Sequence, residues 1–205
     1  MTRFPLVSEN GLSDAQKSAH DGIANLFSRF PSHLTQKNDQ GLFYGPYSSL
    51  FYTEDIADPW LALASKIMRQ QRFTFKEKEL CILAVASEYD VPYLQYAHSE
   101  IGLYAGFTKE QVQEAFHGKL PNGLSDRESA VYNLALKLTK LRKPLDDASF
   151  GQARDILGQD GVAGVAHIVS GYIYVSMLSN IADVGAPKTG EGTFVATKNP
   201  DMARE

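Results

Sequence analysis

Residues 79–107 read ELCILAVASEYDVPYLQYAHSEIGLYAGF, and this stretch decides the fold class. The almost uninterrupted apolar run after Glu79 is typical of a helix that is buried on all sides. Asp90-Val91-Pro92 then marks a turn, and a second helix is expected from Tyr93 until Gly106 ends it. The stretch therefore predicts an antiparallel pair of helices, the first of which lies at the centre of an all-α domain.

Capping boxes, in which Ser or Thr is followed three residues later by Glu or Gln, mark four helix starts along the chain. These pairs are Ser13 with Gln16, Thr74 with Glu77, Thr108 with Gln111 and Ser125 with Glu128. The first of these helices carries its apolar side chains on one face, at Ile23, Leu26, Phe27 and Phe30, and Pro31 ends it.

Proline and glycine punctuate the remaining helices. Asp58-Pro59 predicts an N-cap followed by a first-turn proline, after a loop that contains Gly45. A helix capped by Asp147 or Ser149 is expected to end at Gly158, and a last helix to run over 161–183. With no convincing strand, the sequence predicts a single-domain bundle of about eight helices over residues 1–187, followed by a mobile tail over 188–205.

Composition excludes several classes of protein. The 205 residues carry a net charge of −4 and no basic stripe, so binding to nucleic acid is not expected. No apolar run reaches the length of about 18 residues that spans a membrane, and the first residues do not resemble a signal peptide. The single cysteine, Cys81, excludes an internal disulfide and a cysteine-rich zinc site, and leaves the cytoplasm as the expected location.

The densest polar feature joins the two central helices. Glu79 opens the first helix and His98 lies in the middle of the second, so the antiparallel turn can bring them face to face. A carboxylate and an imidazole among apolar and phenolic side chains can move protons near neutral pH. Spacing alone leaves an alternative open, namely a satisfied core histidine and a surface glutamate in a charged first turn.

The stretch resembles the carboxymuconolactone decarboxylase and alkylhydroperoxidase D group. That group has a Glu, then a Cys-x-x-Cys twelve residues on, and a His four residues after the second cysteine. Here the same spacing gives Glu79, Val91, Leu94 and His98. Further similarities run through Gly45-Pro46-Tyr47, Trp60-Leu61-Ala62-Leu63, Leu124-Ser125-Asp126-Arg127-Glu128 and the last helix up to Pro187, so the resemblance covers about residues 40–187.

The departures from this pattern point to chemistry without thiols. Both cysteine positions are lost, to Val91 and Leu94, and Cys81 lies on the apolar helix without a resolving partner. A thiol peroxidase activity is therefore rejected at this stage. The resemblance instead implies a decarboxylase, or a related lyase or isomerase, that uses no metal and no organic cofactor and acts on a small carboxylated lactone, keto acid or aromatic-derived metabolite.

The resemblance also supplies candidate site residues. It implies His98 and Glu79 as catalytic, with Tyr93, Tyr96 and Leu94 as neighbours of the substrate. His167, on the last helix, is a further candidate for a pocket wall or a subunit contact, with a core histidine as the alternative. No cluster of His, Asp and Glu has convincing metal-ligand spacing, and neither a glycine-rich dinucleotide motif nor a P-loop occurs.

The sequence also gives expectations about the oligomeric state and about a function other than catalysis. The resemblance implies a homo-oligomer, either a trimer or a hexamer. Aromatic residues between Phe43 and Tyr52 favour burial against another subunit. The alternative to an enzyme is a binding or interaction protein that keeps the fold without the chemistry, since fold membership does not decide function.

Overall fold

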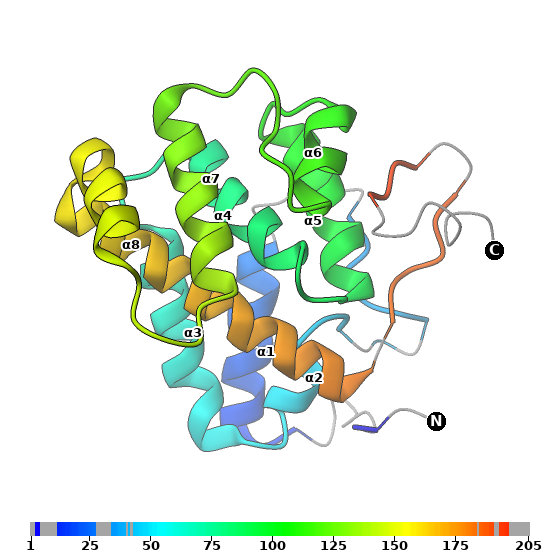
Figure 1. The fold of residues 1–205 in the computed structure, drawn as a ribbon. Helices are drawn as coiled ribbons and strands as arrows, with labels where there is room; N and C mark the ends of the chain where they lie inside the picture. Colours follow the sequence, from blue (N-terminus) through cyan, green and yellow to red (C-terminus); the bar gives the residue numbers. More distant parts are fainter. Residues whose placement is uncertain are drawn as a thin grey trace.

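The computed structural model of the chain describes residues 3–4, 12–27, 34–39, 41, 43–183, 185–190 and 193–196. Its helices are α1 Asp14–Phe27, α2 Tyr47–Leu50, α3 Glu54–Met68, α4 Phe75–Ala86, α5 Pro92–Tyr104, α6 Lys109–Phe116, α7 Asp126–Thr139 and α8 Asp147–Ala182 (Figure 1). In this part of the chain, extended backbone pairs at one isolated bridge, between Lys37 and Phe43. The expected all-α fold is confirmed.

The local helix signals form as expected. At the start of α4, the Thr74 hydroxyl accepts a hydrogen bond from the Glu77 amide at 3.1 Å, and the Glu77 carboxylate accepts one from the Thr74 amide at 2.7 Å. The same reciprocal pairs form at the starts of α1, α6 and α7. Each box satisfies two amides that the helix cannot bond itself, which is why these starts can be read from the sequence. Phe30, Pro31 and the side chains of Leu26 and Phe27 lie outside the described part.

The predicted break at Gly158 is confirmed. Its φ of +75° and ψ of 166° are non-helical, and they divide α8 into two helical halves. Only glycine adopts this region without strain, so the residue fixes the position of the break. The predicted cap is wrong, because Asp146 and not Asp147 or Ser149 accepts the hydrogen bond from the Ser149 amide, at 2.8 Å.

The predicted start of α3 is also wrong. The helix begins at Glu54 after Thr53, and Pro59 lies inside it. A proline there removes the hydrogen bond to the carbonyl of Asp55, four residues earlier. Both Asp55 and Pro59 are exposed, so water can take up that bond and the helix continues.

The segment that was expected to be a loop around Gly45 contains the short helix α2. Gly45 has a φ of +79°, and an added Cβ would stand 3.0 Å from the Tyr93 ring, so glycine is required where this segment passes α5. Every residue of α2 is buried. Burial against the rest of the fold, rather than a local capping signal, therefore accounts for this helix.

Helix α4 is the centre of the molecule and packs against α5, α6, α7 and α8. The apolar residues form two clusters, one around α4 and a second between α1, α2, α3 and α5. Helix α5 belongs to both, because Leu94 points into the first cluster while Tyr93 and Tyr96 point into the second. A side chain on α5 can therefore be enclosed from both sides.

Residues 193–196 return to α5, although they fall within the expected mobile tail. Ala196 is fully buried, and its amide donates a hydrogen bond to the Ser99 hydroxyl at 2.8 Å. Phe194 packs at the edge of the α4 cluster and lies under the ammonium group of Lys109. This short segment thus covers part of the helix that carries His98.

Candidate active site

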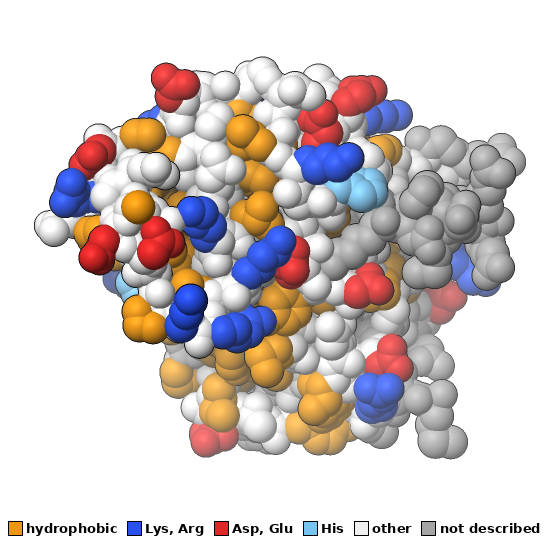
Figure 2. All heavy atoms as spheres, viewed as in Figure 1, with side chains coloured by type: hydrophobic (Ala, Val, Ile, Leu, Met, Phe, Trp, Pro, Cys, Tyr) orange, Lys and Arg blue, Asp and Glu red, His pale blue; other side chains and the backbone are white. Residues whose placement is uncertain are grey.

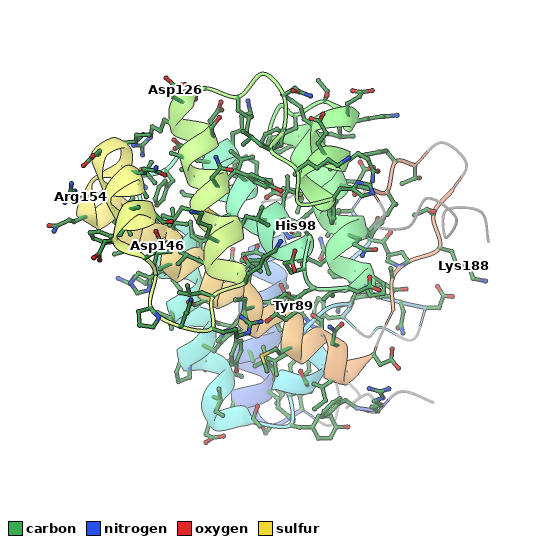
Figure 3. The ribbon with its side chains drawn as sticks, in the orientation of Figure 1. Tyr89, His98, Asp126, Asp146, Arg154 and Lys188 are labelled. Atoms are coloured by element: carbon green, nitrogen blue, oxygen red, sulfur yellow. The ribbon has the colours of Figure 1, made fainter. Side chains whose placement is uncertain are left out.

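Glu79 and His98 meet between the two central helices, where Figure 3 places His98. The Nδ1 atom of His98 lies 2.6 Å from Oε1 of Glu79. Glu79 is 1% exposed and His98 is 6% exposed. The capping box at Thr74 fixes the start of α4, and Pro92 fixes the start of α5, so the two side chains meet because both helix starts are set. The alternative of a surface glutamate is excluded.

The hydrogen bond determines which nitrogen of His98 is available for chemistry. A carboxylate only accepts hydrogen bonds, so the Nδ1–H group donates and the neutral ring carries its free lone pair on Nε2. Within the described residues, Nε2 has no hydrogen-bonding partner. The pair is thus an imidazole oriented by a buried carboxylate, an arrangement that can accept a proton on Nε2 and return it.

Tyr172 of α8 completes this centre and was not among the predicted site residues. Its ring packs edge-to-face on the His98 ring, with 5.4 Å between the centroids and 83° between the planes. Burial, followed by the nearby Glu79 and Tyr47, raises its pKa well above the ordinary value, so the phenol stays protonated. The described residues offer its hydroxyl no hydrogen-bond partner.

A helical period on α8 could have identified Tyr172. Val165, Ile168, Val169 and Ser176 are buried, and Tyr172 continues their spacing of three and four residues. His167 lies on the other side of the helix and is exposed. The alternative that His167 fills the core is therefore wrong, while its place at a pocket wall or at a subunit contact stays a prediction.

Tyr93 and Tyr96 lie beside the site but hold structure together. The Tyr93 hydroxyl donates to the Thr35 carbonyl at 3.3 Å, and the Thr35 amide donates to the Tyr96 hydroxyl at 3.1 Å. Tyr44 stacks on Tyr93, with 5.3 Å between the ring centroids. Burial and the neighbouring phenols raise the pKa of Tyr93. Through these hydrogen bonds to Thr35, both phenols hold residues 34–39 against α5.

Val91 and Leu94, which stand where the family that the sequence resembles has cysteines, are apolar and buried. Leu94 packs in the cluster around α4, and its contact with a substrate stays a prediction. Val91 is buried and also lines a small cleft of about 30 Å³. The cleft is bounded by Gly45, Val91, Pro92, Tyr93, Ser179, Asn180, Asp183 and Gly185. Glu79 and His98 do not line it, so Tyr93 is the single predicted site residue on its wall.

Cys81 is fully buried on α4. Burial raises the pKa of its thiol, and the carboxylates of Glu77 and Glu79 raise it further. A thiol in this environment is not a thiolate at neutral pH. Among the described residues, no group of three or more His, Cys, Asp and Glu side chains is arranged to hold a metal ion.

Comparison with known proteins agrees with this fold. Residues 54–137, which contain both Glu79 and His98, match the carboxymuconolactone decarboxylase family. The chain is also similar to the crystal structure of an alkylhydroperoxidase AhpD core, an uncharacterized peroxidase-related protein from Ralstonia eutropha JMP134. The TM-score is 0.71 at 17% identity over 97% of both chains, which shows the shared fold. No curated protein matches the chain significantly.

Proposed function

We propose, from the premise that this chain is a member of the carboxymuconolactone decarboxylase and alkylhydroperoxidase D group, that it is a cofactor-independent decarboxylase or a related lyase or isomerase. Its substrate would be a small carboxylated lactone, keto acid or aromatic-derived acid. One observation carries the proposal: the buried Glu79 holds Nδ1 of His98 at 2.6 Å and leaves Nε2 for the substrate.

The reaction needs a proton at one carbon atom and a stabilised negative charge at a nearby oxygen. When the bond between the substrate and its carboxylate breaks, CO2 leaves and the electron pair moves into the adjacent carbonyl system as an enolate. Nε2–H of the protonated His98 then delivers a proton to carbon, while the Glu79 carboxylate stabilises the imidazolium before this step. We assign the Tyr172 hydroxyl, whose ring packs on that of His98, the role of hydrogen-bond donor to the enolate oxygen.

Thiol peroxidase chemistry is not part of this proposal, although the structurally similar protein is described as peroxidase-related. A dithiol cycle uses two cysteines that become a disulfide, and this chain has one. That cysteine is fully buried, with a raised thiol pKa. By length and composition α8 could cross a membrane. We nevertheless propose a cytoplasmic location, because one side of this helix packs on α4 and α7 within the fold.

A binding protein without catalysis is the second candidate. The observation in its favour is that the cleft beside Tyr93 is lined by neither Glu79 nor His98. A ligand held in that cleft would contact the Asn180 and Asp183 side of α8 and leave the buried pair untouched.

Product analysis separates the two candidates. The purified chain is incubated with a panel of carboxylated lactones and β-keto acids, and CO2 release is measured together with the NMR spectrum of the products. Release of CO2 by the wild type, lost in the Glu79→Gln variant, is expected for the enzyme. If a panel member raises the melting temperature of the protein but is recovered unchanged, the chain is a binding protein and the proposed chemistry is wrong.

A further inference from the structure

The helices that meet around the Glu79–His98 pair bring no cation to it. Glu79 lies on α4 and His98 on α5, and Tyr172 of α8 packs on the His98 ring. Tyr47 of α2 lies near Tyr172, whose pKa is raised by burial first and then by Glu79 and Tyr47. Lys and Arg are absent from the parts of these four helices that follow, namely residues 47–50, 79–86, 92–104 and 161–182.

The basic residues in the first turn of α4 are engaged elsewhere. Lys76 pairs with Glu128 at 3.1 Å. Lys78 directly precedes the glutamate of the pair, and neighbouring residues on a helix do not face each other. Arg127, on α7, is bound to Glu77 at 2.7 Å. In the described part of the chain no Lys or Arg is buried, and Figure 2 shows these side chains on the surface of the molecule.

The unsatisfied polar groups near the pair are neutral hydroxyls. The Tyr172 hydroxyl has no hydrogen-bond partner among the described residues. Helix α2 packs on α8 and contributes Ser48, whose buried hydroxyl also has no partner among these residues. A hydroxyl can donate a hydrogen bond to a carbonyl oxygen, but it does not neutralise a charge. The α2/α8 contact is therefore equipped for an uncharged polar group.

Charge balance limits what the pair can hold. With His98 protonated and Glu79 ionised, the pair has no net charge, and its imidazolium can match one negative charge. That charge is the carboxylate that leaves: its bond to carbon breaks, the electron pair passes to the adjacent carbonyl as an enolate, and the Nε2 proton of His98 goes to carbon. A carboxylate that stays behind would lie beside the Glu79 carboxylate without a counter-charge, and an unpaired buried charge is costly.

We propose that the substrate has a single carboxylate, which it loses, so that the product is uncharged. This inference rests on the proposed function and narrows its substrate class. Keto acids and lactones with an apolar or neutral polar remainder fit the site, and those that keep a second carboxylate after the reaction do not. The neutral product then leaves a site that carries the Glu79 charge, and it has no ion pair to break.

Turnover of matched substrates tests the proposal. CO2 release by the purified chain is measured for β-keto acids in pairs that differ by esterification of the carboxylate that is retained, with 3-oxopentanedioate and its monomethyl ester as the smallest pair. The spontaneous rate is subtracted. We expect kcat/KM to be at least about tenfold higher for the monoesters. Equal values, or faster turnover of the dianions, overturn the inference and leave the proposed lyase standing. Turnover of neither member of any pair overturns the proposed function and the inference with it.

Protection of His98 from diethylpyrocarbonate tests the same charge rule without turnover. The ligands are pentanedioate and its monomethyl ester, which lack the keto group, and modified peptides are counted by mass spectrometry. The monoester is expected to protect His98 at a concentration at least about tenfold lower than the diacid. The exposed His167 is the internal control and should react equally throughout.

A charge-removing variant completes this measurement. Glu79→Gln should shrink the difference between the two ligands, because it removes the negative charge that disfavours the diacid. Glu88→Gln is the matched control, since it removes a carboxylate just beyond the end of α4 that pairs with Lys140, and it should leave the difference unchanged. Equal protection of His98 by both ligands in the wild type, or protection by neither, contradicts the proposal.

Discussion

Removal of Glu79 or His98 alone should destabilise the fold strongly. The costs of the two single variants should add up to more than the cost of the double variant. The two side chains are buried and hydrogen-bonded to each other at 2.6 Å. Breaking a buried pair by removing one partner costs about 3–5 kcal/mol, because the other polar group stays buried without compensation. His98→Ala and Glu79→Ala should therefore each lower the free energy of unfolding by about that amount.

The unfolding free energy of the double variant distinguishes loss of the hydrogen bond from loss of packing. The double variant leaves no buried polar group without its partner. In each single variant, about 1–3 kcal/mol of the cost is the penalty of the polar group that stays buried without a hydrogen bond. Because each single cost contains one such penalty, the cost of the double variant should fall short of the sum of the two single costs by at least about 2 kcal/mol. Glu79→Gln keeps an acceptor for Nδ1–H and should be milder than Glu79→Ala.

Urea denaturation followed by far-UV circular dichroism measures these four free energies. The matched control combines His98→Ala with Leu157→Ala, a buried leucine in the first half of α8. This combination should add to within about 0.5 kcal/mol, as distant sites do. If the Glu79/His98 double variant is equally additive, the two side chains do not support each other and the reasoning fails.

Three further predictions concern the phenols and the thiol. Tyr172→Phe should lower kcat at least tenfold. Tyr93→Phe loses the hydrogen bond to the Thr35 carbonyl and should mainly lower the melting temperature. Equal effects of the two substitutions on kcat would show that Tyr172 is not part of the site. Because burial raises the pKa values of Tyr47, Tyr93, Tyr132 and Tyr172, their contribution to stability is complete below the unfolded pKa of about 10 and is lost as the pH rises above it. Urea midpoints should therefore fall steeply between pH 9 and pH 11 and less so in Tyr172→Phe, and a flat profile contradicts the assignment. Cys81→Ser should keep full activity per folded molecule, and an inactive but folded variant would reopen thiol chemistry.

Local signals account for the parts of the fold that the sequence predicts well. The four capping boxes and the glycine at position 158 act through the backbone within a few residues, and each forms as expected. Pro59 predicts the wrong start for α3. The free-energy cost of a proline inside a helix depends on whether water can bond the carbonyl of Asp55, and the exposure of that carbonyl is a property of the fold. The helix α2 has no cap bond from a side chain and depends on burial.

The candidate site shows the same division between local and long-range information. The spacing of Glu79 and His98 predicts their contact because both lie on helices joined by one short turn. The burial of Glu79 cannot be predicted from the sequence, because the charged run Lys76-Glu77-Lys78-Glu79 is typical of an exposed helix start. Glu77 in the same run is also buried, and its carboxylate accepts a hydrogen bond from Arg127 at 2.7 Å. Tyr172 contacts His98 from α8, which is remote in the sequence, so no local pattern near residue 98 reveals the contact.

The aromatic segment between Phe43 and Tyr52 illustrates a signal that has two explanations. Its density was expected to cover a neighbouring subunit. Phe43, Tyr44 and Tyr47 are buried within the chain, against α1 and α5, whereas Tyr52 is 49% exposed. The sequence shows the aromatic density, but which of these side chains enter the core depends on how α1, α2 and α5 pack.

The turnover of His98→Ala per folded molecule tests the central claim most directly. The measurement uses a substrate that the wild type decarboxylates, and the folded fraction is taken from circular dichroism. Loss of a positioned proton donor should lower kcat by about 10²–10⁴-fold, with Tyr96→Phe as the neighbouring control on α5 that keeps most activity. A His98→Ala variant that turns over at the wild-type rate would show that the buried pair with Glu79 is structural and that the chemistry lies elsewhere.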